Sequence, residues 1–213
     1  MAGDDLVLRE LKSRGLLLKQ DKRLPNVVTL VTAESLSTSW WSHPAGRQIF
    51  AVLSRLADDP DVLFAKLLFG KVTLVHRKLW PAFLAAATSG EDWQKEGLSD
   101  AARRLLLEVR RKGAARASGP AVQELERRLI LRTEEIHTQS GRHETVLEEW
   151  ATWARRVGCV EMPSAGHGKA ALEQAALSLG APLEALPWHG VRDRPSRSRG
   201  RSSLRSPTSR KSR

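Results

Sequence analysis

The 213-residue sequence predicts an α+β fold that is mostly helical, with short β-hairpins and a disordered basic tail at the C-terminus. Several stretches repeat apolar residues at spacings of three and four, which is the pattern of amphipathic helices. One pair of apolar runs and a second, more polar pair of segments flank short stretches that contain glycine, which indicates hairpins. Residues 191–213 hold almost no apolar side chains and many arginines and serines, so they are not expected to form a core.

The first 36 residues predict one helix and two strands. Asp5–Arg14 has the spacing of a helix that stops at Gly15. Leu16–Lys19 and Asn26–Val31 are predicted as strands on either side of a polar loop. The second of these contains a dense apolar run of valine and leucine, as expected for a buried strand.

Residues 37–87 contain three of the seven tryptophans and most of the apolar residues that can build a core. Apolar residues recur with helical spacing over residues 49–56, which predicts an amphipathic helix. Leu63–Phe69 and Val72–His76 are apolar runs separated only by Gly70-Lys71. A two-residue turn that begins with glycine is a hairpin signal, so these runs predict a β-hairpin with positive φ at Gly70.

Leu79–Ala87 completes this region as a short apolar helix, with Pro81 in its first turn. Trp80 and Phe83 lie three residues apart in this helix, and we expect both side chains to face inward. Thr88–Gly97 is a polar connector, and its composition marks it as the best candidate for a boundary between subdomains.

Two helices and a hairpin are predicted in the second half. Ser99 is placed to cap a helix over Asp100–Lys112, and Pro120–Leu129 follows as the next helix. Ile130–Thr138 and His143–Leu147 are interpreted as a hairpin that leads into a helix. The same residues also fit a helical period that continues past residue 150, and a continuous helical arrangement is the alternative.

The C-terminal part begins with a break rich in small residues. Gly166-His167-Gly168-Lys169 has part of a phosphate-loop pattern but lacks the remaining glycine spacing, so we interpret it as a linker. Lys169–Leu179 is an alanine-rich helix that ends at Gly180. The predicted organisation is an N-terminal α+β subdomain over residues 1–90, a helical subdomain over residues 91–190 and the tail over residues 191–213.

The positive charge is concentrated in the tail. The whole chain carries a formal net charge of +11. Residues 191–213 contain eight arginines and one lysine against one aspartate, a net charge of +8, which leaves +3 for residues 1–190. Nucleic-acid binding by the folded part therefore cannot be argued from total charge.

Composition also limits the compartment and the chemistry. No run of eighteen apolar residues predicts a membrane span, and the acidic start of the sequence lacks a hydrophobic signal region, so we expect a cytoplasmic protein without membrane contact. The lone Cys159 excludes an internal disulfide framework and is interpreted as a small buried thiol. We find no complete metal, cofactor or catalytic motif, so no metal or cofactor is predicted and the catalytic residues are unknown.

A few aromatic and histidine residues are the first candidates for a binding pocket. Trp40 and Trp41 suit core packing as well as base stacking, and His76 suits a structural hydrogen bond as well as a catalytic role. The residues that we would test first as a pocket are Trp40, Trp41, His43 and His76. The same tryptophans support an alternative function, a non-enzymatic protein-interaction module with a Trp-rich surface.

The order of two helices and a hairpin over residues 100–147 resembles a winged helix, a fold that sets a recognition helix and a wing against duplex DNA. Three pieces, KLLFGKVTLVHRKLWPAFLA, LSDAARRLLLEVRRKGAARASG and LERRLILRTEEIHTQSGRHETVLEEWATWA, resemble bacterial proteins related to the AlkZ/YcaQ family of winged-helix DNA glycosylases. The resemblance covers about residues 16–155. That family carries a Gln-aliphatic-Gln or Gln-aliphatic-Asp motif, whereas this chain has only the adjacent pair Gln20-Asp21, so no catalytic residue is transferred.

This resemblance implies winged-helix-like units and a partnership with duplex DNA, with a role in DNA repair. Arginines on the helices and the hairpin would then neutralise phosphates, which positions a protein without reading base sequence. The predicted contacts are Arg103, Arg110, Arg111, Arg116, Arg127, Arg128, Arg132 and Arg142. A DNA glycosylase is the enzymatic version of this hypothesis, with a flipped base held in an apolar pocket beside a carboxylate or histidine.

Overall fold

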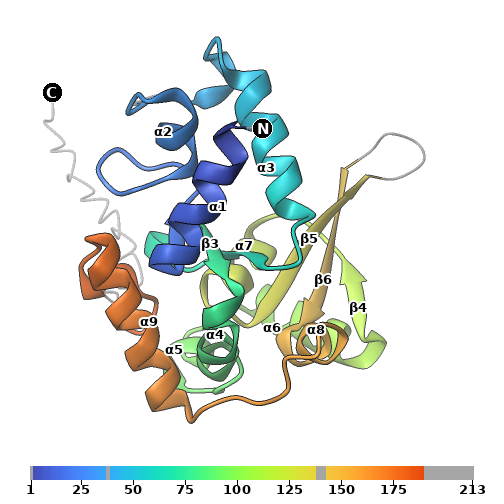
Figure 1. Ribbon diagram of the computed structural model, residues 1–213. Coiled ribbons are helices and arrows are strands. Elements are labelled where there is room, and N and C mark those ends of the chain that lie inside the picture. Colours follow the sequence, from blue (N-terminus) through green and yellow to red (C-terminus); the bar gives the residue numbers. More distant parts are fainter. Residues whose placement is uncertain (1, 37–38, 138–142, 190–213) are drawn as a thin grey trace, which may run out of the picture.

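The computed structural model describes residues 2–36, 39–137 and 143–189 (Figure 1). It confirms an α+β fold in which helices surround two small antiparallel sheets of three strands each. The predicted tail and Arg142 lie outside the described residues. Within those residues, no helix is long and apolar enough to cross a membrane.

The first unit contains three helices and one sheet in which β3 is the central strand, in the order β1-β3-β2. Its elements are α1 (Ala2–Arg14), β1 (Leu16–Leu18), α2 (Val27–Thr32), α3 (Gly46–Ala57), β2 (Val62–Lys66) and β3 (Val72–His76). Gly15, with φ of 81°, ends α1 at the predicted residue. The amphipathic helix predicted around residues 49–56 is confirmed as α3.

The strand predicted over Asn26–Val31 is wrong, because this segment forms α2. The Asn26 side chain accepts a hydrogen bond of 2.9 Å from the backbone N–H of Thr29, which caps the first turn. Val27 and Val28 are buried, as a strand would also have made them. The apolar pattern therefore identified the buried residues, and the local cap decided the backbone conformation.

The hairpin of β2 and β3 is confirmed, but its turn is longer than predicted. Val62 pairs with His76 and Lys66 pairs with Val72, so residues 67–71 form the connection. Gly70 has the predicted positive φ of 63°, and Phe69 beside it has φ of 55°. The prediction of a two-residue turn is therefore wrong, because five residues connect the strands. Two consecutive residues of this loop have left-handed backbone conformations.

A helical layer follows the first sheet. It consists of α4 (Trp80–Ala87), the short α5 (Asp92–Lys95), α8 (Trp150–Arg156) and α9 (Ala165–Leu179). Trp80 and Phe83 are buried as predicted, with exposed fractions of 3% and 0%. The interpretation of Gly166–Lys169 as a linker is wrong, because Ser164 caps α9 and these residues form its first turns.

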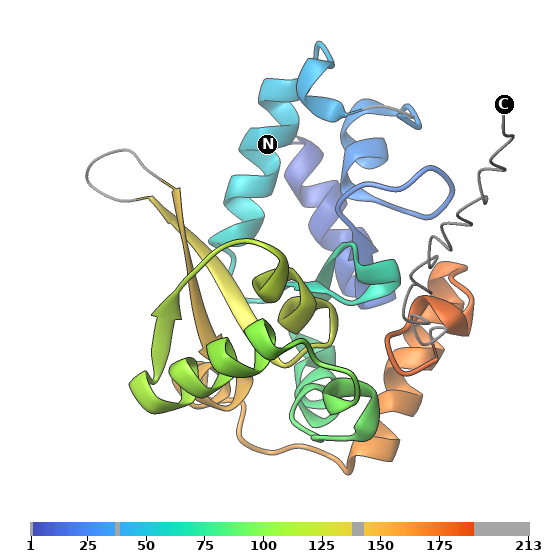
Figure 2. The ribbon, with the colours of Figure 1, turned by 180° about the vertical axis from the view of Figure 1, so that it is seen from behind.

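The second unit contains the second sheet, with strand order β4-β6-β5. Its elements are α6 (Asp100–Lys112), β4 (Ala114–Arg116), α7 (Pro120–Arg127), β5 (Leu131–His137) and β6 (His143–Glu149). Ser99 caps α6 as predicted, through a hydrogen bond from the Ala102 N–H. The hairpin is confirmed and the continuous helix is wrong, while β4 was not predicted. The β5–β6 hairpin extends away from the body in both views (Figures 1 and 2).

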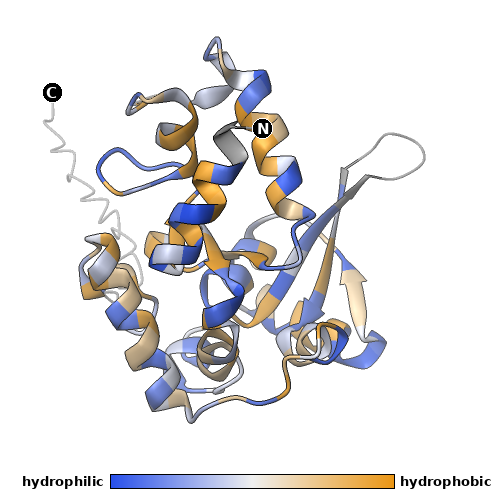
Figure 3. Ribbon diagram, viewed as in Figure 1, coloured by the Kyte–Doolittle hydropathy of each residue, from blue (hydrophilic) through white to orange (hydrophobic). Residues whose placement is uncertain are grey.

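Three groups of buried side chains form the core. One lies within the first unit, where apolar residues of α1, α3 and β3 meet (Figure 3). Another lies within the second unit and includes Val109, Leu125 and Leu147. The largest includes Leu16, Phe83, Trp150 and Leu172, and it therefore contains residues from both sides of the predicted boundary at residue 90.

Candidate functional site

A cleft of about 740 Å³ lies between the two sheets. Lys66 of β2 and Glu126 of α7 line it and form an ion pair of 2.5 Å. Glu126 also accepts a hydrogen bond from the Thr133 hydroxyl of β5. These contacts link β2 of the first unit to α7 and β5 of the second, and they hold this side of the cleft together.

Carboxylates outnumber cations in this cleft. The acidic lining residues are Asp58, Asp59, Glu126, Glu134 and Glu135, and the basic ones are Lys19, Lys66 and Arg132. Two of the three cations are already paired with carboxylates. A phosphate backbone entering the cleft would meet net negative charge, so we do not assign the cleft to the DNA backbone.

Lys19 is the remaining cation of the cleft. Burial lowers the pKa of its ammonium group, and the nearby charge of Glu135 acts in the opposite direction. The Lys19 Nζ lies 5.6 Å from the ring centroid of Trp40, within the range of a cation–π contact. This contact connects the cleft to the aromatic residues that precede α3.

An aromatic platform, which we define as Trp41 and Phe50, lies on the surface beside Trp40. The rings of Trp40 and Trp41 stack with centroids 4.0 Å apart and an angle of 24° between planes. Trp40 is buried, whereas Trp41 and Phe50 are 66% and 50% exposed, with ring centroids 5.9 Å apart. The platform therefore presents two large aromatic rings to solvent.

Neither predicted histidine lines the cleft, and neither do Trp40 and Trp41. The Nδ1 of His43 accepts a hydrogen bond of 3.1 Å from the Ala45 N–H just before α3. The Nδ1 of His76 accepts one of 3.2 Å from the Lys78 N–H after β3. Burial lowers the pKa of His76 while Asp61 opposes the change. Both histidines therefore act as local backbone caps, and none of the four predicted residues lines this cleft.

Three of the predicted arginines are exposed and form no direct ion pair within the described ranges, although the charge of Arg111 acts on the nearby Glu108. They are Arg103 and Arg111 of α6 and Arg127 of α7. Arg103 and Arg127 each use only Nε internally, to donate to the carbonyls of Leu98 and Gln123. Their remaining guanidinium N–H groups are available for phosphate.

Arg110 and Arg116 are also exposed but form ion pairs. The Nε atoms lie 3.0 Å from carboxylate oxygens of Glu149 and Glu144, respectively. Exposed pairs of this kind contribute about 0–1 kcal/mol each, so they can be exchanged for phosphate contacts at small cost.

Arg128 and Arg132 hold the second unit together instead of forming a basic surface. Arg128 donates to the carbonyls of Trp93 and Glu96 at 3.1 and 2.7 Å. Arg132 is only 15% exposed, pairs with Glu148 at 2.7 Å and lies against the ring of Trp153. Both side chains therefore have internal partners, which any contact with DNA would have to replace.

Gln94 is a structurally important residue that the sequence pattern does not reveal. It lies in the predicted polar connector but is only 2% exposed. Its amide donates to the carbonyls of Ala87 and Leu129 and accepts from the Gly90 N–H. The side chain thus fastens the connector to α4 and α7, and a glutamine in a polar turn gives no sequence signal for this role.

Comparisons with family models, curated proteins and solved structures find no match to this chain. In the described part of the chain, no group of three or more histidine, cysteine, aspartate or glutamate side chains is arranged to hold a metal ion.

Proposed function

We propose that this protein associates with duplex DNA through two winged-helix-like units. The strand order is the observation that carries the proposal. A winged helix places its first strand beside the last strand of the following hairpin, and the first unit has this arrangement in β1-β3-β2. Two helices, α2 and α3, lie between β1 and the hairpin, as in a helix-turn-helix with a wing.

The second unit repeats the arrangement with one departure. Its sheet order, β4-β6-β5, matches that of the first unit strand for strand. Only α7 lies between β4 and the hairpin, where the first unit has two helices. The projecting β5–β6 hairpin takes the position of the wing in this proposal.

The proposed phosphate contacts lie on α6. We define the α6 arginine face as Arg103, Arg104 and Arg111, all of which are exposed. Arg104 and Arg111 are seven residues apart and lie on one side of the helix, with Arg103 beside Arg104. No acidic side chain among the described residues forms an ion pair with them, so binding phosphate would break no existing pair.

A salt-dependent titration of a labelled DNA duplex tests this proposal. Replacing all three residues of the α6 arginine face by glutamine should weaken binding and reduce the slope of log affinity against log salt by up to about 3. A matched variant replaces Arg9, Lys22 and Arg23, three exposed cations of the first unit. Because the first unit is also proposed to approach DNA, this variant should have a smaller effect, and equal effects of the two triple variants would contradict the assignment of the main phosphate contacts to α6.

We extend the proposal to DNA repair, as a relative of DNA glycosylases. The cleft between the units combines tryptophan walls, Trp80 and Trp153, with the carboxylates Glu134 and Glu135. A base-excision site needs an apolar pocket beside such a group. An assay for abasic sites on alkylated duplex DNA tests the activity, and Glu135→Gln should reduce it. DNA binding without formation of abasic sites would exclude the glycosylase activity and leave the proposal of DNA association.

The aromatic platform supports a second candidate, a protein-interaction module. Exposed large aromatic side chains are enriched in protein interfaces. If Trp41 and Phe50 bind a second copy of the chain, sedimentation equilibrium should show concentration-dependent association, and Trp41→Ala should abolish it. A monomer at all concentrations would exclude self-association through the platform.

A further inference from the structure

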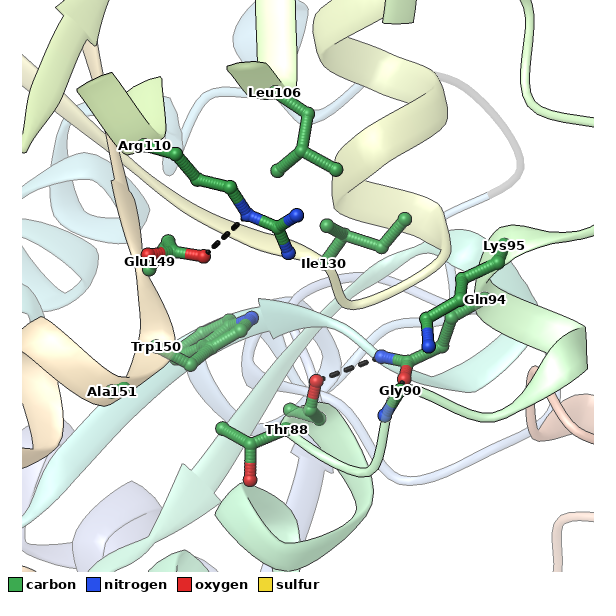
Figure 4. A pocket seen from close by; sticks show the side chains of 11 residues that line it. Thr88, Gly90, Gln94, Lys95, Leu106, Arg110, Ile130, Glu149, Trp150 and Ala151 are labelled. Atoms are coloured by element: carbon green, nitrogen blue, oxygen red, sulfur yellow. Dashed lines mark hydrogen bonds and ion pairs between the residues drawn. The ribbon is translucent and has the colours of Figure 1, made fainter. Parts of the chain in front are cut away.

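A second and smaller pocket, of about 310 Å³, lies where α6 approaches the junction of β6 and α8 (Figure 4). Its apolar walls include Leu106 of α6, Ile130 and the indole ring of Trp150. Arg110 and Glu149 lie at one side and are joined by their ion pair of 3.0 Å. The volume is at the lower end of the range for small-molecule sites, which is roughly 300–1,000 Å³.

The indole N–H of Trp150 is buried without a hydrogen-bond partner in the described structure. The side chain is only 3% exposed, and Figure 4 shows the nitrogen on the edge of the ring that faces Ile130 and Gln94. Other tryptophans differ, since Trp80 and Trp93 donate their indole N–H groups at 3.1 and 2.8 Å. A buried donor without an acceptor destabilises the folded protein by about 1–3 kcal/mol, so an acceptor bound at this N–H would be stabilising.

Gln94 is not that acceptor. Its side-chain oxygen already accepts hydrogen bonds from the Gly90 N–H and the Ser89 hydroxyl, at 2.8 and 3.2 Å. The side-chain amide oxygen of Gln94 is therefore already engaged and does not accept a hydrogen bond from Trp150. A molecule that enters the pocket can supply the missing oxygen.

The other polar groups around the pocket indicate the charge of that molecule. Arg110 uses Nε for Glu149, and Figure 4 shows its two terminal nitrogens toward the pocket interior. Lys95 adds a second cation to the lining, against the single carboxylate. The free groups are thus mainly donors with net positive charge, which favours an anionic acceptor.

We infer that this pocket binds a small carboxylate with a flat apolar body. The carboxylate accepts hydrogen bonds from Arg110 and from the indole N–H of Trp150, and the body packs between Leu106 and Ile130. This inference concerns a ligand site away from the α6 arginine face and does not depend on DNA binding.

Nuclear magnetic resonance of the seven indole N–H groups in the full chain provides the test, with sodium benzoate as the probe. Trp150→Phe assigns the Trp150 signal. Benzoate should shift that signal in a saturable manner, while benzamide, which has a similar shape without the charge, should bind at least about tenfold more weakly. Arg110 is 54% exposed, so Arg110→Gln should fold normally and weaken benzoate binding at least about tenfold.

Arg111→Gln is the matched control, because it removes the same charge from the next position of α6 and leaves the pocket intact. It should leave the dissociation constant for benzoate unchanged. A second pair tests the apolar wall: Leu106→Phe should block binding, and Leu107→Phe, on the exposed side, should not.

Three outcomes would overturn the inference. One is an unchanged Trp150 signal at millimolar benzoate, including the case in which that N–H shows a cross-peak to a long-lived water. Another is equal binding of benzoate and benzamide, which would remove the requirement for an anion. The third is an equal loss of binding in Arg110→Gln and Arg111→Gln, which would place the interaction elsewhere on α6.

Discussion

Gly168 of α9 lies directly against the main-chain oxygen of Ala82 in α4. A Cβ atom built at Gly168 would be 2.6 Å from that oxygen and 2.9 Å from the Cβ of Ala85. The close approach explains why glycine stands in the first turns of α9. It also explains how this late helix covers α4 and completes the largest group of buried side chains.

Gly168→Ala should destabilise the protein by about 1–3 kcal/mol, because the added methyl group would collide with backbone that cannot easily move. Gly166→Ala, two positions earlier in the same helix, meets no atom within 4 Å and should leave stability unchanged or slightly higher. Urea denaturation of both variants measures the difference. Equal stabilities of the two variants would show that α4 and α9 move apart enough to accommodate the methyl group without measurable loss of stability.

Phe83→Ala should reduce the free energy of unfolding by about 3–5 kcal/mol. Phe83 is fully buried and meets Trp150 edge to face, with ring centroids 4.7 Å apart. Phe50→Ala is the control, because half of that ring is exposed and less apolar surface would be lost. Denaturant melts of the two variants should therefore differ clearly, and similar losses would contradict the central place of Phe83 in the core.

The elements with a strong local signal were predictable from sequence. The period of α3, the Ser99 cap of α6 and the apolar helix around Phe83 were all assigned correctly. The segment after Asn26 was not, because the same buried valines suit a strand or a helix and only the side-chain cap decided between them. β4 was missed because three residues, two of them exposed, carry too little pattern.

The candidate site was less predictable, because it depends on partners that are distant in sequence. Arg128 and Arg111 look alike in the sequence, yet the first binds backbone carbonyls of the connector and the second faces solvent. The acidic cleft arises where the two units meet, and the unpartnered indole of Trp150 lies where the helical layer meets the second unit. Local spacing contains no information on such encounters.

Asp21 should make the stability of the protein depend on pH below about pH 4. Burial alone would raise the pKa of this carboxyl, but the hydrogen bond from Lys71 and those from the N–H groups of Arg23 and Leu24 outweigh it and lower the pKa to about 2. An unfolded aspartate titrates near about 3.9, so the folded state binds fewer protons in this interval. The stabilisation is therefore present above about pH 4 and is lost as the pH falls toward about 2.

Asp21→Asn should lower the free energy of unfolding near neutral pH by about 1 kcal/mol, since Lys71 is half exposed and solvent weakens the pair. The same variant should flatten the dependence of stability on pH between about 2 and 4. Thermal melts over this range measure both effects. Asp58→Asn removes an exposed carboxylate and should change neither; an identical profile for the two variants would contradict the assignment to Asp21.

Deleting residues 191–213 should weaken binding to DNA without lowering the melting temperature. The segment carries a net charge of +8 and almost no apolar side chains, so its sequence offers charge but little material for a core. Arginines that neutralise phosphates release counterions, and the slope of log affinity against log salt should therefore become shallower on deletion.

A full-length variant with serine in place of these eight arginines and Lys211 should behave like the deletion, which separates the effect of charge from that of length. Unchanged affinity and slope in both variants would show that the segment does not contact DNA. Complete loss of binding would instead contradict the α6 arginine face, because that face is intact in both variants and should retain a measurable, salt-dependent affinity.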